Sequence, residues 1–173
     1  MYVVRRDLAE AVRWFDEALA QAEATDDMFA TTLAITNRAW MFIALGHPRG
    51  DLFERNLVLA TALGNVDGAA YALEGLIAIA VLEHHIERAG VLTGAAEAVR
   101  QLTGMGEQAT IVTFEPFVES VLATDAAPAF ESARARGRAM TVREATEYAL
   151  APSDREALSA SAMPLGAVPQ ESP

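Results

Sequence analysis

The sequence predicts an all-α protein built from repeated helical hairpins. Apolar residues recur at helical spacing through most of the chain, and no segment shows the sustained alternation of apolar and polar residues that is typical of strands. Turn-forming residues also recur at an interval of 38 or 39 residues. A hairpin of this kind cannot bury its apolar face alone, so neighbouring hairpins are expected to stack.

The first two helices form one predicted hairpin. Apolar residues between positions 8 and 22 recur at the i, i+3, i+4 and i+7 positions of one helical face. The segment Thr25-Asp26-Asp27 breaks this pattern and supplies a side chain that can cap the next helix. That helix is expected over residues 28–45, with Gly46 as the C′ residue that ends it.

The next two helices repeat this arrangement. One has Pro48 in its first turn and runs to residue 63, and the other covers about residues 66–83. The turn at 25–26 corresponds to the turn at 64–65, and the turn at 46–48 corresponds to the turn at 84–86. A period in this range is typical of helical solenoids such as tetratricopeptide repeats, whose unit is slightly shorter.

A third unit is expected to open near Glu87. Its first helix ends at residues 102–104, and its partner helix is expected between residues 108 and 123. Pro116 interrupts this partner, so the ordered helix is predicted to begin near Glu115.

Two short helices and a tail complete the predicted chain. Asp125 can cap a helix over about residues 126–136, which Gly137 is expected to stop. The segment Thr141-Val142-Arg143-Glu144 has the form of a capping box and starts a helix to about residue 151. Residues 152–173 are rich in Ser, Ala, Pro and Gly and are predicted to be disordered, so the repeat domain is assigned to residues 1–151.

Charge and composition exclude several classes of function. The chain of 173 residues has a formal net charge of −11 and no cysteine, which argues against direct nucleic-acid binding and excludes disulfides and thiolate metal sites. All 13 basic residues are arginine, so there is no lysine for a P-loop. No apolar run is long enough to cross a membrane, and the N-terminus does not read as a signal peptide. We therefore expect a cytoplasmic protein without a membrane partner.

Several segments of the chain carry a family resemblance: residues 71–76, 87–89, 92–98, 130, 137–141 and 144–150. On these residues the chain resembles the C-terminal tetratricopeptide-like region of actinobacterial LuxR-type and SARP (AfsR-like) transcriptional regulators and of related predicted ATPases. The resemblance covers about residues 5–150 and is more specific from Tyr71 onward.

The resemblance implies a non-catalytic module for protein–protein interaction or regulatory sensing. In such regulators a nucleotide-binding switch domain precedes the repeats, and the repeats are thought to sense a ligand or a partner protein. This chain departs from the family at Arg134, where an aromatic residue is usual, and at Arg136, where an acidic residue is usual. No cofactor and no enzymatic activity are expected.

The residues that could carry chemistry favour structural roles. His84 and His85 with Glu83 and Glu87 are the one metal-like cluster, but adjacent helical residues point about 100° apart and cannot easily face one ion. A solvated turn between helices explains them better than a metal site.

Seven residues are candidates for partner or ligand binding. The arginines are the predicted electrostatic anchors for an acidic protein or peptide. For Asn37 and Trp40 two interpretations are open, either packing in the core or a contact with a ligand in the groove. The alternative function is a small-molecule sensor, with the ligand enclosed by the repeats against Trp40 or Asn37. A second copy of the chain is a further candidate partner, because the first helix of a stacked array lacks a neighbour. The candidates are Arg5, Asn37, Arg38, Trp40, Arg134, Arg136 and Arg138.

Overall fold

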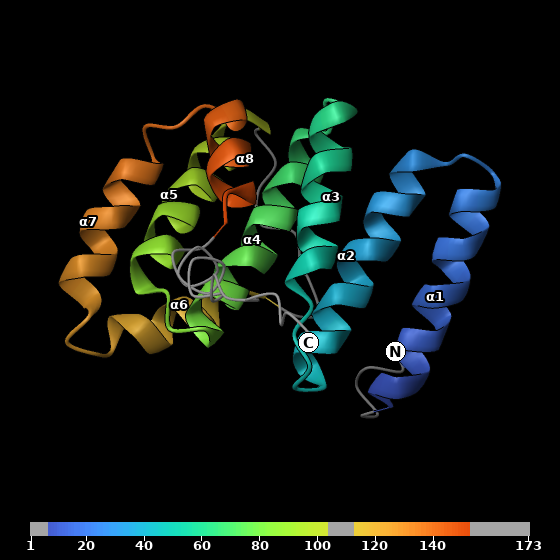
Figure 1. The fold of residues 1–173 in the computed structure, drawn as a ribbon, viewed down its shortest axis with the longest axis horizontal. Helices are drawn as coiled ribbons and strands as arrows, with labels where there is room; N and C mark the ends of the chain where they lie inside the picture. The colour runs from blue at the N-terminus through green and yellow to red at the C-terminus, as the bar shows by residue number, and fades with distance from the viewer. Residues whose placement is uncertain (1–6, 104–112, 153–173) are drawn as a thin grey trace, which may run out of the picture.

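The computed structural model describes residues 7–103 and 113–152. These ranges contain eight helices and no strand, which confirms the predicted all-α fold (Figure 1). Arg5 and nearly all of the predicted tail lie outside the described residues. The helices are α1 (Leu8–Ala24), α2 (Met28–Ala44), α3 (Gly50–Ala62), α4 (Val66–Leu82), α5 (Ile86–Thr103), α6 (Glu115–Leu122), α7 (Ala127–Gly137) and α8 (Val142–Leu150).

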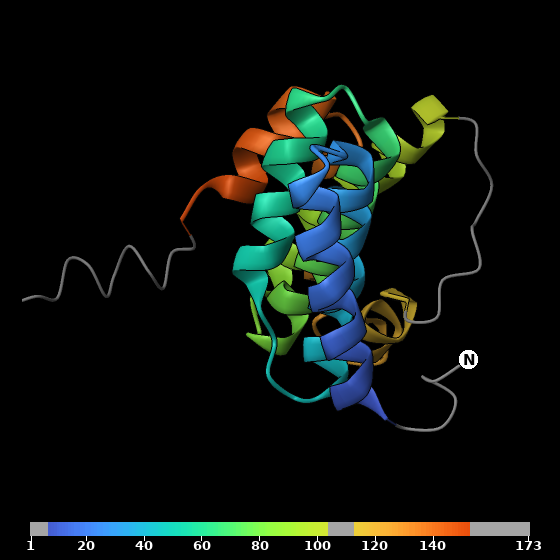
Figure 2. The ribbon, with the colours of Figure 1, turned by 90° about the vertical axis from the view of Figure 1, so that its right-hand side faces the viewer.

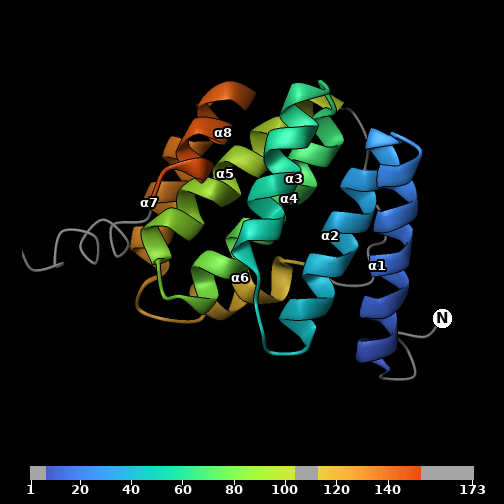
Figure 3. The ribbon, with the colours of Figure 1, turned by 45° about the vertical axis from the view of Figure 1, so that its right-hand side comes forward.

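The long helices stand side by side in chain order from α1 to α5, and α7 closes the far end (Figures 1 and 3). The helix α2 packs on both α3 and α4, and α4 in turn packs on α6. The helix α8 returns over the array and contacts α3, α4 and α5. Viewed from the α1 end, α2 and α6 lie toward one side of the array, and α3 and α8 lie toward the other (Figure 2).

The four turns between α1 and α5 have one geometry, and each turn of the first pair recurs 38 residues later. Each turn has one residue in the left-handed region, and the amide of the next residue donates to a carbonyl five positions earlier. This is the Schellman arrangement, which satisfies the last carbonyls of a helix. The left-handed residues are Asp26 (φ 53°), Gly46 (φ 77°), Gly64 (φ 64°) and His84 (φ 61°). The predicted correspondence of the turns is therefore confirmed.

Side chains at the helix starts explain where several helices begin. Asp27, Asn65 and Thr141 each accept a hydrogen bond from the backbone three residues later, and Thr141 forms the predicted capping box with Glu144. Two predictions about helix starts were wrong. Pro48 precedes α3 instead of opening it, because α3 begins at Gly50. Asp125 does not cap α7, whose N-cap is Ala126 without a side-chain hydrogen bond; Pro128 in the first turn fits that start, since it needs no amide partner.

The core follows α4, which is buried on most sides by α2, α3, α5, α6 and α8. Phe53 of α3 is fully buried and packs edge-on against Trp40, with ring centroids 5.4 Å apart. A Cβ on Gly75 would lie 2.1 Å from the Phe53 ring, so this glycine leaves the space that Phe53 fills. The buried Asn56 donates a hydrogen bond of 2.7 Å to Thr36 and ties α3 to α2.

The third hairpin differs from its prediction. The partner of α5 is α7, and not the segment at 108–123, of which the described part forms α6 on α4. The helices α5 and α7 approach closely at glycines: a Cβ on Gly94 would lie 2.0 Å from the carbonyl oxygen of Arg134, and one on Gly137 would lie 2.0 Å from that of Val91. The helix α7 ends at Gly137, as predicted, and the missing side chain of this residue also permits the close backbone contact.

Polar contacts hold α8 across the array. The hydroxyls of Thr61 and Thr146 lie 3.2 Å apart. Arg88 donates a hydrogen bond of 2.6 Å to the carbonyl of Ala149 at the end of α8. The arginine charge also suits the negative end of that helix. None of the described helices is long and apolar enough to cross a membrane.

Candidate interaction surface

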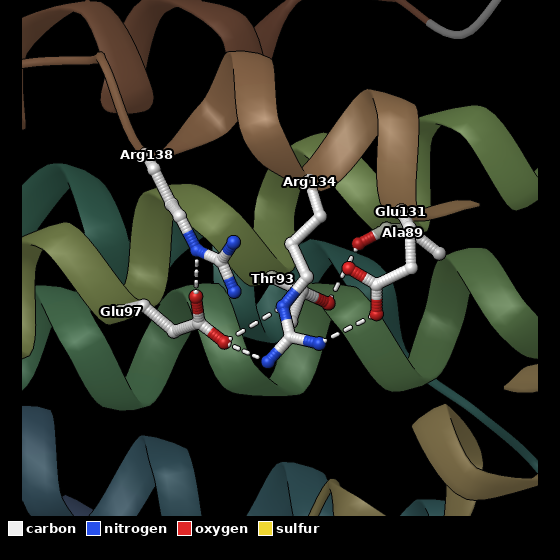
Figure 4. Close-up of polar contacts among 6 residues, drawn as sticks. All are labelled: Ala89, Thr93, Glu97, Glu131, Arg134 and Arg138. Carbon is white, nitrogen blue, oxygen red and sulfur yellow. Dashed lines mark hydrogen bonds and ion pairs between the residues drawn. The ribbon is translucent and has the colours of Figure 1, made fainter. Parts of the chain in front are cut away.

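The predicted arginine anchors of α7 are paired within the chain. Arg134 donates to Glu97 of α5 and, at 2.8 Å, to Glu131 of its own helix. Arg138 donates to the second Glu97 oxygen at 2.7 Å (Figure 4). Glu97 therefore accepts hydrogen bonds from both arginines, about one turn along α5 from the contact at Gly94. These side chains hold two helices together and do not form an unpaired basic patch.

The electrostatics of Glu97 show how strongly this cluster is matched. Burial raises the pKa of its carboxyl, but hydrogen bonds and charge from Arg134 and Arg138 outweigh burial and hold the pKa below its usual range. Arg136 forms an ion pair with Glu87 at a more exposed position. Each of the three predicted α7 anchors thus already has an acidic partner on α5.

Arg38 is also engaged inside the fold. It lies 2.5 Å from Asp16 of α1, and its guanidinium lies 5.1 Å from the centre of the Phe42 ring. The ion pair ties α2 to α1, whereas the contact with Phe42 lies within α2 itself. Apart from Arg13, every arginine in the described part of the chain lies against a carboxylate or a backbone carbonyl. The remaining pairs are Arg49–Asp51, Arg55–Glu23, Arg100–Glu74 and Arg143–Glu147, with Arg88 on the end of α8.

The other two candidates lie in different surroundings. Trp40 is only 7% exposed and packs on Phe53, so its placement favours the packing interpretation. Asn37 is half-buried in the middle of α2. The structure therefore does not bring the sequence-predicted residues together into one site.

Sequence reasoning missed an exposed apolar face of α2. Phe29 and Leu33 lie one turn apart and are 68% and 53% exposed, and Asn37 continues the same face one turn further on. We call Phe29, Leu33 and Asn37 the α2 stripe. In the sequence, the available signal for the α2 stripe was an apolar pair at i and i+4. A second apolar face of the same helix, formed by Ile35, Ala39 and their neighbours, fills the core.

The helix α4 lies next to α2 and continues the surface that carries the α2 stripe. It packs on α2, and the 38-residue repeat places Asp67 and Tyr71 where α2 has Phe29 and Leu33. Tyr71 lies under the guanidinium of Arg100, 4.3 Å from the ring centre, and Arg100 also donates 2.8 Å to Glu74. Burial of Glu74 outweighs the attraction of Arg100 and raises the pKa of this carboxyl. The surface thus changes from apolar side chains on α2 to polar side chains on α4.

The predicted metal-like turn remains a turn. His84 is the left-handed residue of the α4–α5 connection, and His85 Nδ1 lies 3.4 Å from Glu83. Among residues 7–103 and 113–152, no three histidine, aspartate or glutamate side chains gather in a way that could hold a metal ion. Comparisons of the chain with protein-family models, with curated proteins and with solved structures find no match.

Proposed function

We propose that this chain is a non-catalytic protein-interaction module that binds a partner protein through the α2 stripe. The observation that carries the proposal is the exposure of Phe29 and Leu33 on a helix whose other face is fully packed. Adjacent large apolar side chains on an ordered surface favour a site that is covered by another molecule. Helix-in-groove and helix-on-helix recognition both use anchors spaced one turn apart.

The repeated hairpins support a tetratricopeptide-like assignment within this proposal. Four turns share one hydrogen-bond pattern, and each turn of the first pair recurs 38 residues later, as a repeat array requires. Together with the resemblance to LuxR-type and SARP regulators, they favour a regulatory role. The proposed partner is then a protein domain, such as the nucleotide-binding switch domain of a regulator.

A small-molecule sensor is the alternative, and the placement of Trp40 disfavours it. The indole is packed on Phe53 inside the core, so a ligand in contact with it would first have to open the α2–α3 interface. Phe29 and Leu33 need no rearrangement to make contact. We therefore favour a protein partner.

Affinity capture with matched variants tests the proposal. The double variant Phe29→Gln/Leu33→Gln removes the apolar stripe, and glutamine is a good helix former. Val58→Gln on α3, where Val58 is 49% exposed, is the control for loss of an exposed apolar side chain elsewhere. The wild-type chain and the control are expected to retain the same protein from lysate of the source organism, and the double variant is expected to lose it. Retention of that protein by a folded double variant would contradict the proposal.

A further inference from the structure

We propose that the segment bound by the α2 stripe is a basic amphipathic helix, with apolar anchors one turn apart and lysine or arginine beside them. This inference rests on the proposed function and adds the chemistry of the partner. It follows from three features of the described residues: the spacing of the apolar anchors, the acidic residues next to them, and the engagement of the nearby arginines.

The apolar part of the surface fits one face of a helix. Phe29 and Leu33 lie four residues apart, which is about 6 Å along the axis of α2. A partner helix with anchors at i, i+4 and i+7 has the same period, so its side chains can pack between these residues.

Acidic residues lie at the end of this surface where α2 begins. Asp26 and Asp27 directly precede α2, and Asp67 lies in the first turn of α4. The helices α2 and α4 begin at the same end of the array (Figure 1). Asp67 also occupies the repeat position of Phe29 on the adjacent helix. A negative charge therefore lies beside the apolar anchors.

Asp67 adds negative charge at the edge of this surface. The residue is half-buried, and its Oδ1 has no hydrogen-bond donor among the described residues. Because that oxygen is shielded, a partner would interact with Asp67 through charge attraction at the surface and not through a bond to Oδ1. Lysine or arginine on the partner helix can provide the opposite charge.

Three arginines on the helices around this surface are already engaged, and Arg13 of α1 is the exception among the described residues. Arg38 is paired with Asp16 and Arg55 with Glu23, whereas Arg100 is held by Glu74. An acidic partner would have to displace one of these carboxylates, and it would be repelled by Asp26, Asp27 and Asp67. This reverses the charge expected from the arginine pattern of the sequence, since the surface favours a cationic partner. Nucleic acids and anionic lipid surfaces are disfavoured for the same reason.

Binding of synthetic peptides to the full chain tests the inference. The probe is a fluorescently labelled helical peptide of about four turns, with leucine at i, i+4 and i+7 and lysine on the flanking positions. Two matched peptides carry glutamate in place of lysine, or the same residues in scrambled order. Fluorescence anisotropy gives the dissociation constant of each peptide at low and at physiological salt.

The lysine peptide is expected to bind more tightly than both matched peptides, and its binding should weaken as salt rises. Leu33→Gln is expected to weaken it about tenfold, which corresponds to about 1.4 kcal/mol of lost contact. Asp67→Asn should weaken it several-fold, and Val58→Gln should leave it unchanged. These results together would support the inference.

Two results would overturn the inference. Equal binding of the scrambled peptide would show attraction by net charge alone, and equal or tighter binding of the glutamate peptide would show that the surface does not select a cation. If the glutamate peptide binds and still depends on Leu33, the interaction surface stands and only the basic partner is wrong. If no peptide depends on Leu33, the inference fails, and the affinity capture described above decides separately whether the stripe binds protein.

Discussion

Replacing Gly94 by alanine is expected to destabilise the protein by forcing α5 and α7 apart. The new Cβ would lie 2.0 Å from the carbonyl oxygen of Arg134 and 2.8 Å from the amide of Arg138, whereas ordinary contacts begin near 3.4 Å. Both neighbours are backbone atoms, so no side-chain rotation can relieve the overlap. Overpacking of this kind costs about 3 kcal/mol, of which the better helix propensity of alanine recovers about 1 kcal/mol.

We therefore expect Gly94→Ala to lower the free energy of unfolding by about 2 kcal/mol, or the melting temperature by about 6 °C in a chain of this size. Urea unfolding followed by circular dichroism at 222 nm measures it. Gly50→Ala is the matched control, because its Cβ would meet only the Ile79 side chain at an ordinary 3.5 Å. A Gly94→Ala variant as stable as the control would refute the close approach of α5 and α7.

Two further variants test the polar contacts. Glu97→Gln should lower the free energy of unfolding at pH 7 by about 1 kcal/mol, because the Arg134 and Arg138 pairs lose their charge. Since the folded state lowers the pKa of Glu97, this contribution is present above the ordinary pKa of about 4.3 and is lost as the pH falls through the folded value. The difference between wild type and variant should therefore shrink in urea titrations as the pH is lowered below the ordinary pKa, and a difference that does not change with pH would contradict it. Thr141→Ala should lower the free energy of unfolding by about 1 kcal/mol because it removes the capping box with Glu144, whereas Thr141→Ser should retain most of this stability. Hydrogen exchange in α8 should be faster in Thr141→Ala than in the wild type, and equal exchange rates would argue against the cap.

The sequence was a good guide to the first two hairpins because local chemistry determines their turns. Asp27 and Asn65 cap the helices that follow them, and Gly46 and Gly64 adopt the left-handed backbone that glycine favours. His84 shows that the repeat predicts a turn even where glycine is absent, since it has the same backbone as Gly46. Helix ends of this kind depend on only a few consecutive residues.

The third unit was harder to predict because its contacts are distant in sequence. The α5–α7 pair depends on Gly94 meeting the backbone near Arg134, and on Glu97 meeting Arg134 and Arg138 about 40 residues later. Read locally, Gly137 is a helix stop and the arginines are free cations. The spacing of Gly90 and Gly94 by four residues was the available signal, since small residues at this interval let two helices approach closely.

The most direct test of the central claim is photocrosslinking in cells of the source organism. A photoreactive phenylalanine analogue at position 33 lies on the α2 stripe, and one at position 58 lies on the exposed face of α3. Our account predicts that position 33 crosslinks to a distinct protein, through a segment rich in apolar and basic residues, and that position 58 does not. Absence of a crosslink at position 33, or the same product at both positions, would contradict the account.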